Sequence, residues 1–285
     1  MQTNIIHNQD CVAGMLALPA KSVDIAVTSP PYNLGIEYGT YKDNKPRQDY
    51  LAWLETVFVA VKHCLKDDGH FWLNVGYSNV DPWVAMDVAQ VARSHFVLQN
   101  SFIWVKSIYV NGKTSGHFKP INSKRFASPT WEHHFHFTKD GNVAIDRLAV
   151  GVPYEWYEAN LRNEKTAKTK PNLRCKGNTW FIPYDTISNK AKHRGNHPAT
   201  YPVALVEESI KVSGVTNGVL LDPFMGSGTS AIAAVNQNLE YIGFDVDADY
   251  IQFANDRIAD HTKAQQYNTP KNLFEDVVDL PDDVC

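Results

Sequence analysis

The chain has 285 residues, 44% of them hydrophobic and 20% charged, and its formal net charge is −4 at pH 7. These values exclude an intrinsically disordered or fibrous protein and suit one large α/β domain that carries a smaller insertion. No run approaches the roughly 18 apolar residues of a membrane span, and the N-terminus has neither the basic start nor the apolar stretch of a secretory signal. We therefore expect a cytoplasmic protein with no membrane partner.

Short apolar runs and helical patterns follow one another along the chain. Five runs do not alternate with polar residues, which predicts strands buried on both faces of a parallel sheet. They are residues 4–10, 23–30, 69–76, 218–224 and 241–247. Helical spacing occurs in residues 48–65, 230–239 and 248–261.

Gly69 is a natural C-terminal stop for the helix predicted over residues 48–65. Two further runs, residues 96–106 and 132–139, resemble strands nearer an edge. The sequence thus predicts a doubly wound, mostly parallel α/β sheet of seven strands.

Positive charge is concentrated in residues 106–194, where 16 Lys and Arg stand against 7 Asp and Glu; the rest of the chain has 11 against 24. This segment is also rich in Gly, Pro and Asn, which predicts an irregular insert with mobile loops. Such a surface can neutralise phosphates, and a solvated basic loop is the alternative. Lys124 and Arg125 lie in it and are candidate DNA contacts.

The strand, turn, helix and strand predicted over residues 218–247 form a crevice of the nucleotide-binding type. Gly226 and Gly228 let a ligand approach the backbone, and Asp245 can accept hydrogen bonds from ribose hydroxyls. A phosphate loop requires a lysine after its last glycine, and none follows Gly228. The third glycine of a dinucleotide site is also missing. S-adenosylmethionine, a nucleoside without phosphates, fits better, with Asp222 facing its ammonium group.

The strand over residues 23–30 ends in Thr28-Ser29-Pro30-Pro31-Tyr32-Asn33. Proline fixes φ and supplies no N–H, so Ser29, Pro30 and Pro31 are expected to hold rigid acceptors with no competing donor. Tyr32 adds a face on which a planar base can stack. The motif therefore predicts a site that accepts hydrogen bonds from an amino group.

Together these motifs resemble the amino-methylating DNA methyltransferases, which methylate exocyclic amines of cytosine or adenine. The catalytic motif stands first and the glycines last, as in the family's β group. The resemblance implies a Rossmann-like, circularly permuted class I methyltransferase fold, S-adenosylmethionine as cofactor and double-stranded DNA as partner. It also allows a cognate endonuclease in a restriction-modification system.

The resemblance assigns catalysis to Ser29, Pro30, Pro31 and Tyr32. It assigns cofactor binding to Asp10, Cys11, His197, Pro198, Asp222, Pro223, Phe224, Gly226, Ser227, Gly228, Thr229 and Asp245. A flipped-out base would stack on Tyr32 while Ser29 and the Pro30 carbonyl hold its amine for direct displacement, without a covalent enzyme intermediate.

The predicted domain boundaries follow from these assignments. Residues 1–106 form the catalytic half, 107–195 the target-recognition insert with an edge strand near 132–139, 196–262 the cofactor-binding half and 263–285 an acidic tail.

Several alternatives remain open. Ser29 favours the 4-amino group of cytosine over the 6-amino group of adenine, because adenine enzymes of the family usually have Asp or Asn at this position. A catalytically silent DNA-binding protein and an RNA or small-molecule methyltransferase are the other classes.

The cysteines and the histidines at 133–136 have structural explanations. The four cysteines form no C-x-x-C pair and none follows proline, which disfavours zinc, disulfides and a carbon-5 nucleophile. The alternation at His133, His134 and His136 places these side chains on two faces of a strand, so we expect no metal.

Overall fold

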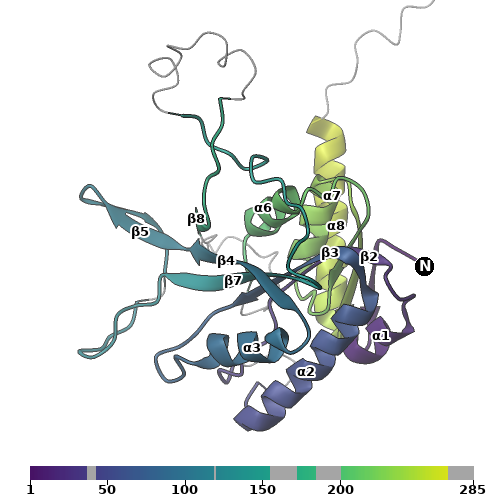
Figure 1. Ribbon diagram of the computed structural model, residues 1–285, viewed down its shortest axis with the longest axis horizontal. Helices are drawn as coiled ribbons and strands as arrows, with labels where there is room; N and C mark the ends of the chain where they lie inside the picture. Colours follow the sequence, from purple (N-terminus) through teal and green to yellow (C-terminus); the bar gives the residue numbers. More distant parts are fainter. Residues whose placement is uncertain (37–42, 119, 155–171, 184–199, 269–285) are drawn as a thin grey trace, which may run out of the picture.

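The computed structural model describes residues 1–36, 43–118, 120–154, 172–183 and 200–268. Its centre is an eight-stranded sheet in the order β1-β10-β9-β2-β3-β7-β4-β8 (Figure 1). In that order the strands are Ile5–Asn8, Glu240–Asp245, Val219–Asp222, Val23–Thr28, Leu65–Val75, Trp131–Thr138, Val97–Val105 and Thr179–Phe181. Only β7 runs antiparallel to its neighbours, β3 and β4.

Helices cover both faces of this sheet, as a doubly wound fold requires. On one face lie α1 (Cys11–Ala17), α2 (Arg47–Cys64) and α3 (Val84–Arg93), which pack against residues such as Leu73 and Phe244. On the other lie α6 (Val203–Ser213), α7 (Thr229–Asn236) and α8 (Ala248–Asn268). None of the helices described between Cys11 and Asn268 is both long and apolar enough to span a bilayer.

The seven predicted strands are present, and the structure corrects their number and position. The three-residue strand β8 adds an eighth member beside β4, within the segment expected to be irregular. The run 132–139 is not an edge strand, because β7 lies between β3 and β4 and is mostly buried.

Gly69 does not end a helix. Helix α2 stops at Cys64, Leu65 is already extended at φ −66° and ψ 137°, and Gly69 lies inside β3. Helix and strand therefore join without a turn. A Cβ at position 69 would lie 2.7 Å from Leu65 Cγ, so glycine there relieves crowding next to the junction.

The basic segment contains a second, two-stranded sheet. Strands β5 (Ser107–Val110) and β6 (Lys113–Gly116) form an antiparallel hairpin that extends away from the helices (Figure 1). Its turn contains Asn111 and Gly112, both with positive φ, the backbone that a tight hairpin turn needs. Tyr109 at its outer end is 72% exposed.

The histidines of β7 divide between the two faces of the sheet, as predicted. His133 stacks on Phe135, whereas His134 and His136 stack on Trp72 from the opposite face. His136 Nε2 is 3.0 Å from His70 Nδ1, and His134 Nε2 is 2.8 Å from Ser209 Oγ. Within the described residues, no group of three or more His, Cys, Asp or Glu side chains has the arrangement of a metal site.

Candidate active site

The carboxyl ends of four parallel strands meet at one edge of the sheet. Asn8 of β1 pairs with Asp245 of β10. Asp222 of β9 pairs with Gly243 of β10, two residues before Asp245. Strand β2 lies next to β9, and Thr28 Oγ1 at its end donates a 2.7 Å hydrogen bond to Asp222 Oδ1. The two motifs that the sequence singled out are therefore in direct contact.

The turn after β9 depends on glycine. Gly226 and Gly228 have φ values of 49° and 79°, the left-handed region, and a Cβ at Gly228 would lie 3.0 Å from Ala254 Cβ. The Gly226 N–H donates to Asp245 Oδ2 at 2.9 Å, and the Asp247 N–H donates to Asp245 Oδ1 at 2.9 Å. Asp245 thus ties the turn to the end of β10, and burial raises the pKa of its carboxyl group.

Asp222 is almost completely buried and accepts four hydrogen bonds. Thr28 Oγ1 and the Phe224 N–H donate to Oδ1, while the Tyr201 hydroxyl at 3.0 Å and the Ser230 hydroxyl donate to Oδ2. Desolvation raises its pKa, and these hydrogen bonds oppose that shift. Both oxygens are directed at protein groups, so Asp222 holds the cofactor turn in place; its contact with an ammonium group stays a prediction.

Ser227 and Thr229 of the cofactor loop are buried and contact helix α8. Arg257 Nη1 of α8 donates to the Ser227 carbonyl at 2.9 Å and to Thr229 Oγ1 at 3.1 Å. Pro223 is buried, and Phe224 is half-buried with its ring 5.5 Å from that of Trp53. The loop is therefore held by α8 on one side and by the contact between Phe224 and Trp53 on the other.

Asp10 and Cys11 lie where α1 begins. Asp10 caps the helix by accepting from the Ala13 N–H at 3.0 Å. Burial, together with the carboxylates of Asp10 and Asp222, raises the pKa of the Cys11 thiol to about 12. This leaves almost no thiolate at neutral pH, which argues against Cys11 as a nucleophile. His197 and Pro198 lie outside the described residues.

The catalytic motif follows β2 directly, and its tyrosine points inward. The Tyr32 hydroxyl is 2.8 Å from Ser29 Oγ and 3.0 Å from Glu132 Oε2. Desolvation and then the Glu132 charge raise the pKa of Tyr32 well above its usual value, so the phenol stays protonated. Tyr32 is only partly buried.

One of the two proline carbonyls already has a donor. The Tyr50 hydroxyl of α2 donates to the Pro31 carbonyl at 2.8 Å, so the prediction of acceptors without competing donors is wrong for Pro31. Within the described part of the chain no hydrogen bond reaches the Pro30 carbonyl. Ser29 and Pro30 are thus the acceptors that the motif can offer.

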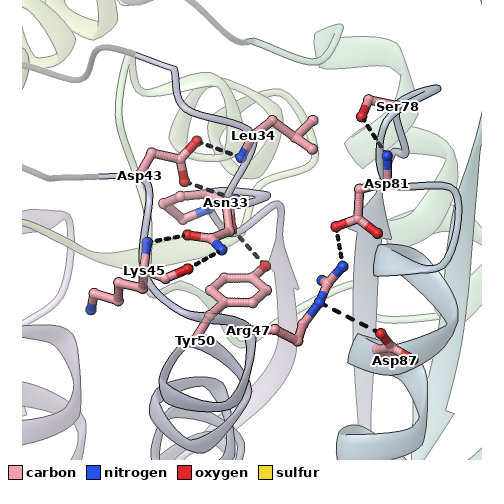
Figure 2. A network of polar contacts seen from close by, with 10 residues as sticks. Asn33, Leu34, Asp43, Lys45, Arg47, Tyr50, Ser78, Asp81 and Asp87 are labelled. Carbon is pink, nitrogen blue, oxygen red and sulfur yellow. Dashed lines mark hydrogen bonds and ion pairs between the residues drawn. The ribbon is translucent and has the colours of Figure 1, made fainter.

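A clasp, formed by Asn33, Asp43 and Lys45, closes the loop after the motif (Figure 2). Asp43 accepts from the N–H groups of Asn33, Leu34 and Ile36 at 2.8, 3.0 and 3.2 Å. Asn33 Nδ2 donates to the Lys45 carbonyl at 2.8 Å, and the Lys45 N–H returns a 2.7 Å bond to Asn33 Oδ1.

The clasp connects back to both motifs. Lys45 Nζ lies 4.6 Å from the centroid of the Trp53 ring, which also packs against Phe224 of the cofactor loop. At the start of α2, Arg47 pairs with Asp81 and, at 3.6 Å, with Asp87 of α3 (Figure 2). The loop that carries Tyr32 is therefore anchored at both ends.

Lys124 and Arg125 are exposed and form no ion pair with the described residues. Arg125 lies 4.9 Å from the centroid of the Phe126 ring. Nothing in the structure brings these two side chains to the Ser29 edge, and their contact with DNA stays a prediction.

Sequence reasoning missed several residues that shape the site. They are Asn74, Lys106, Glu132, Tyr201 and Ser230. The one signal available was the single carboxylate of Glu132 at the head of an otherwise apolar and histidine-rich strand. Tyr201 lies in the predicted cofactor-binding half, residues 196–262, but its hydrogen bond to Asp222 has no sequence signature.

Comparison with known proteins now assigns the family. The sheet order, with a single antiparallel strand, is that of the class I methyltransferases, as in PvuII DNA methyltransferase (cytosine-N4-specific), which superimposes with a TM-score of 0.67 over 92% of each chain at 16% identity. A family model described as DNA methylase (N6_N4_Mtase) matches residues 23–256, and the chain belongs to this family.

Curated relatives agree over most of their length. Type II methyltransferase M.ScaI of Streptomyces caespitosus is 30% identical over 265 residues, which cover 89% of this chain and 81% of that protein. DNA adenine methyltransferase YhdJ of Escherichia coli (strain K12) is 24% identical over 273 residues, covering 92% and 85%. Other solved neighbours were determined in complex with S-adenosyl-L-methionine.

Proposed function

We propose that this DNA methylase transfers the methyl group of S-adenosylmethionine to the 4-amino group of a cytosine flipped out of duplex DNA. The observation that carries the proposal is the 2.7 Å hydrogen bond between Thr28 and Asp222. It joins the residue before the acceptor motif to the residue before the cofactor turn, so the acceptors and the cofactor share one edge of the sheet.

The residues present at this edge fit S-adenosylmethionine. Arg257 holds the Ser227 carbonyl and the Thr229 hydroxyl, and the glycines carry no side chain, so a nucleoside could approach the turn closely. Asp245 accepts two N–H groups, and a carboxylate has further lone pairs for ribose hydroxyls. Asp10 and Cys11 would lie near the adenine, and Phe224 would line the same space.

At the acceptor motif, Ser29 Oγ and the Pro30 carbonyl would hold the two N–H bonds of the target amine. Both are acceptors on a rigid turn, so they draw the nitrogen lone pair out of conjugation with the ring and aim it. Tyr32 would stack on the flipped base. When bound, S-adenosylmethionine supplies an activated sulfonium methyl, and its transfer to nitrogen leaves S-adenosylhomocysteine and a proton.

Residues 107–195 form, in this proposal, the surface that selects the DNA sequence. The β5–β6 hairpin supports it, because it projects from the core and exposes Tyr109 and Lys113 (Figure 1). Basic and aromatic side chains together suit phosphates and bases. The type II relatives also suggest a partner endonuclease. Of the predicted acidic tail 263–285, residues 263–268 belong to α8 and the rest lie outside the described residues.

The choice of base depends on Ser29. Serine precedes the two prolines more often in enzymes that act on cytosine, whereas Asp or Asn is usual for adenine. The name of the PvuII enzyme supports cytosine and that of YhdJ supports adenine, so adenine is the second candidate. Both bases offer an exocyclic amine to the same acceptors.

Nucleoside mass spectrometry tests the base. Duplex DNA is incubated with the purified protein and methyl-labelled S-adenosylmethionine, then digested to nucleosides. We expect label in 4-methylcytosine; label confined to 6-methyladenine would transfer the proposal to adenine. Label in neither base, with the cofactor bound, would indicate a silent DNA-binding protein. Protein-free and cofactor-free reactions are the controls.

A further inference from the structure

A partly buried chain of polar side chains leads from the acceptor motif into the sheet. It begins at Ser29 and passes through the Tyr32 hydroxyl to Glu132 of β7, at steps of 2.8 and 3.0 Å. Lys106 Nζ, just after β4, completes it with a 2.8 Å ion pair to Glu132 Oε1. The Lys106 and Glu132 side chains are 17% and 14% exposed, so this pair is far less screened than a surface ion pair.

The chain has a direction, because its members differ in what they can donate. A carboxylate has no proton, so Glu132 accepts at every contact. Its Oε2 receives the Tyr32 hydroxyl at 3.0 Å and Asn74 Nδ2 at 2.6 Å. The backbone carbonyl of Asn74 is another acceptor for Tyr32, but it is uncharged and 3.4 Å away. The Tyr32 hydroxyl therefore donates to the Glu132 carboxylate.

The direction then propagates to Ser29. The single hydroxyl proton of Tyr32 is committed to Glu132, and Asn74 Nδ2 donates to the Tyr32 oxygen at 2.9 Å. Towards Ser29, 2.8 Å away, Tyr32 can act only as an acceptor. Ser29 must donate its one proton to Tyr32, which leaves only lone pairs on Ser29 Oγ for any other partner.

We propose that Glu132 is a positioning residue that orients the Tyr32 and Ser29 hydroxyl protons so that Ser29 meets the target amine as a hydrogen-bond acceptor. The inference rests on the proposed role of Ser29 in holding that amine. Without the carboxylate, Ser29 can turn its proton outward, towards the N–H groups that it is meant to bind. Lys106 acts through Glu132 by fixing the position of its carboxylate.

The substitution Glu132→Gln tests the direction while keeping the size of the side chain. With the glutamine oxygen held by Lys106, its NH₂ group faces Tyr32 and can only donate, so the Tyr32 hydroxyl loses its carboxylate acceptor. Tyr32 then passes its proton to Ser29. We expect kcat to fall about 10- to 100-fold, the cost of one misdirected hydrogen bond near a charge, with the cofactor Kd unchanged.

A matched control separates this effect from the loss of a buried charge. Glu208 of α6 pairs with Lys176 at 2.7 Å, with side chains 21% and 24% exposed. Glu208→Gln removes a comparable ion pair elsewhere, and we expect parental kcat. Urea unfolding of both variants shows whether either has lost its fold.

Tyr32→Phe keeps the ring and removes the relay, and it carries the test even if Glu132→Gln does not fold. Alone, it should lower kcat about tenfold or more with the cofactor Kd unchanged. Combined with Glu132→Gln, it should lower kcat no further, because the carboxylate has nothing left to orient.

Parental kcat in Glu132→Gln or in Tyr32→Phe, or losses that add in the double variant, would overturn the inference. These results require a parent protein that methylates DNA. If the parent transfers no methyl group, the proposed function fails first and the role of Glu132 fails with it; an active parent with an indifferent Glu132→Gln removes the inference alone.

Discussion

Asp43 is 3% exposed and serves three backbone N–H groups of the loop that follows the acceptor motif. Asparagine in its place has one acceptor oxygen instead of two, and its NH₂ group would face backbone donors. We expect Asp43→Asn to lower the free energy of unfolding by about 1–3 kcal/mol. Methyl transfer should slow as well, because the loop positions Tyr32.

Urea unfolding and initial methylation rates measure these two effects. Asp140→Asn is the matched control, since Asp140 is exposed and serves only the Asn142 N–H, at 2.8 Å. If both variants unfold alike, the clasp contributes nothing to stability.

At single residues, the sequence revealed what a local motif encodes. Ser29, Gly226 and Gly228 belong to short patterns whose backbone demands can be read directly from residue type. Glu132 could not be found in this way, because its role depends on a contact with Tyr32 that only strand pairing between β3 and β7 creates. Likewise, Asp222 was expected to face a ligand, and only the structure shows the four donors around it.

At the scale of elements, β3 and β7 bring three neutral histidines into the core. Burial lowers the pKa of His70 to about 4 and of His134 and His136 to about 3. In the unfolded chain the same groups titrate near about 6.5. Below that pH the unfolded chain binds protons that the folded chain refuses, so we expect the free energy of unfolding to fall as pH drops from about 6.5 towards 4.

Each histidine contributes at most about 1.4 kcal/mol per pH unit in this window. His134→Gln keeps a donor for Ser209 Oγ and removes one titrating group, so its slope between about pH 7 and 5 should be smaller by up to one proton. Asp43, Asp222 and Asp245 have raised pKa values and act with the opposite sign. These three carboxyl groups are present in both the parent and His134→Gln, so their contribution cancels in the difference between the two slopes. Equal slopes would contradict the assignment.

Strands and helices were predictable to the extent that they carry a long apolar pattern. Such patterns predicted the parallel strands β1, β2, β3, β9 and β10 and the helices α2, α7 and α8. β8 has three residues in a basic segment, and it exists because β4 pairs with it and Trp180 is buried beneath. The position of β7 depends on a long-range antiparallel pairing, which no local pattern encodes.

At the scale of the whole molecule, residues 106–194 carry a net positive charge and the rest of the chain a net negative charge. If residues 107–195 select the DNA sequence, replacing them by the corresponding segment of a related enzyme, with β7 and its Glu132 kept, should transfer that enzyme's methylated sequence. The logarithm of DNA affinity should also fall linearly with the logarithm of salt concentration, because paired phosphates release counterions. Sequencing of the methylated sites and binding titrations at several salt concentrations measure both.

An unchanged target sequence in the exchanged protein would remove the recognition role from this segment. Cofactor affinity is the internal control, since the turn at 222–228 and Asp245 lie outside the exchanged residues and should bind as before.

The pairing of β1 with β10 also means that the sheet can be completed only late in translation. Ile5–Asn8 are translated well before Glu240–Asp245, their neighbour in the sheet. β2 similarly waits for Val219–Asp222. Contacts so distant in the chain close late. The acceptor motif is thus translated long before its cofactor turn, and a nascent or prematurely terminated chain that stops short of β9 has no site with which to mark DNA.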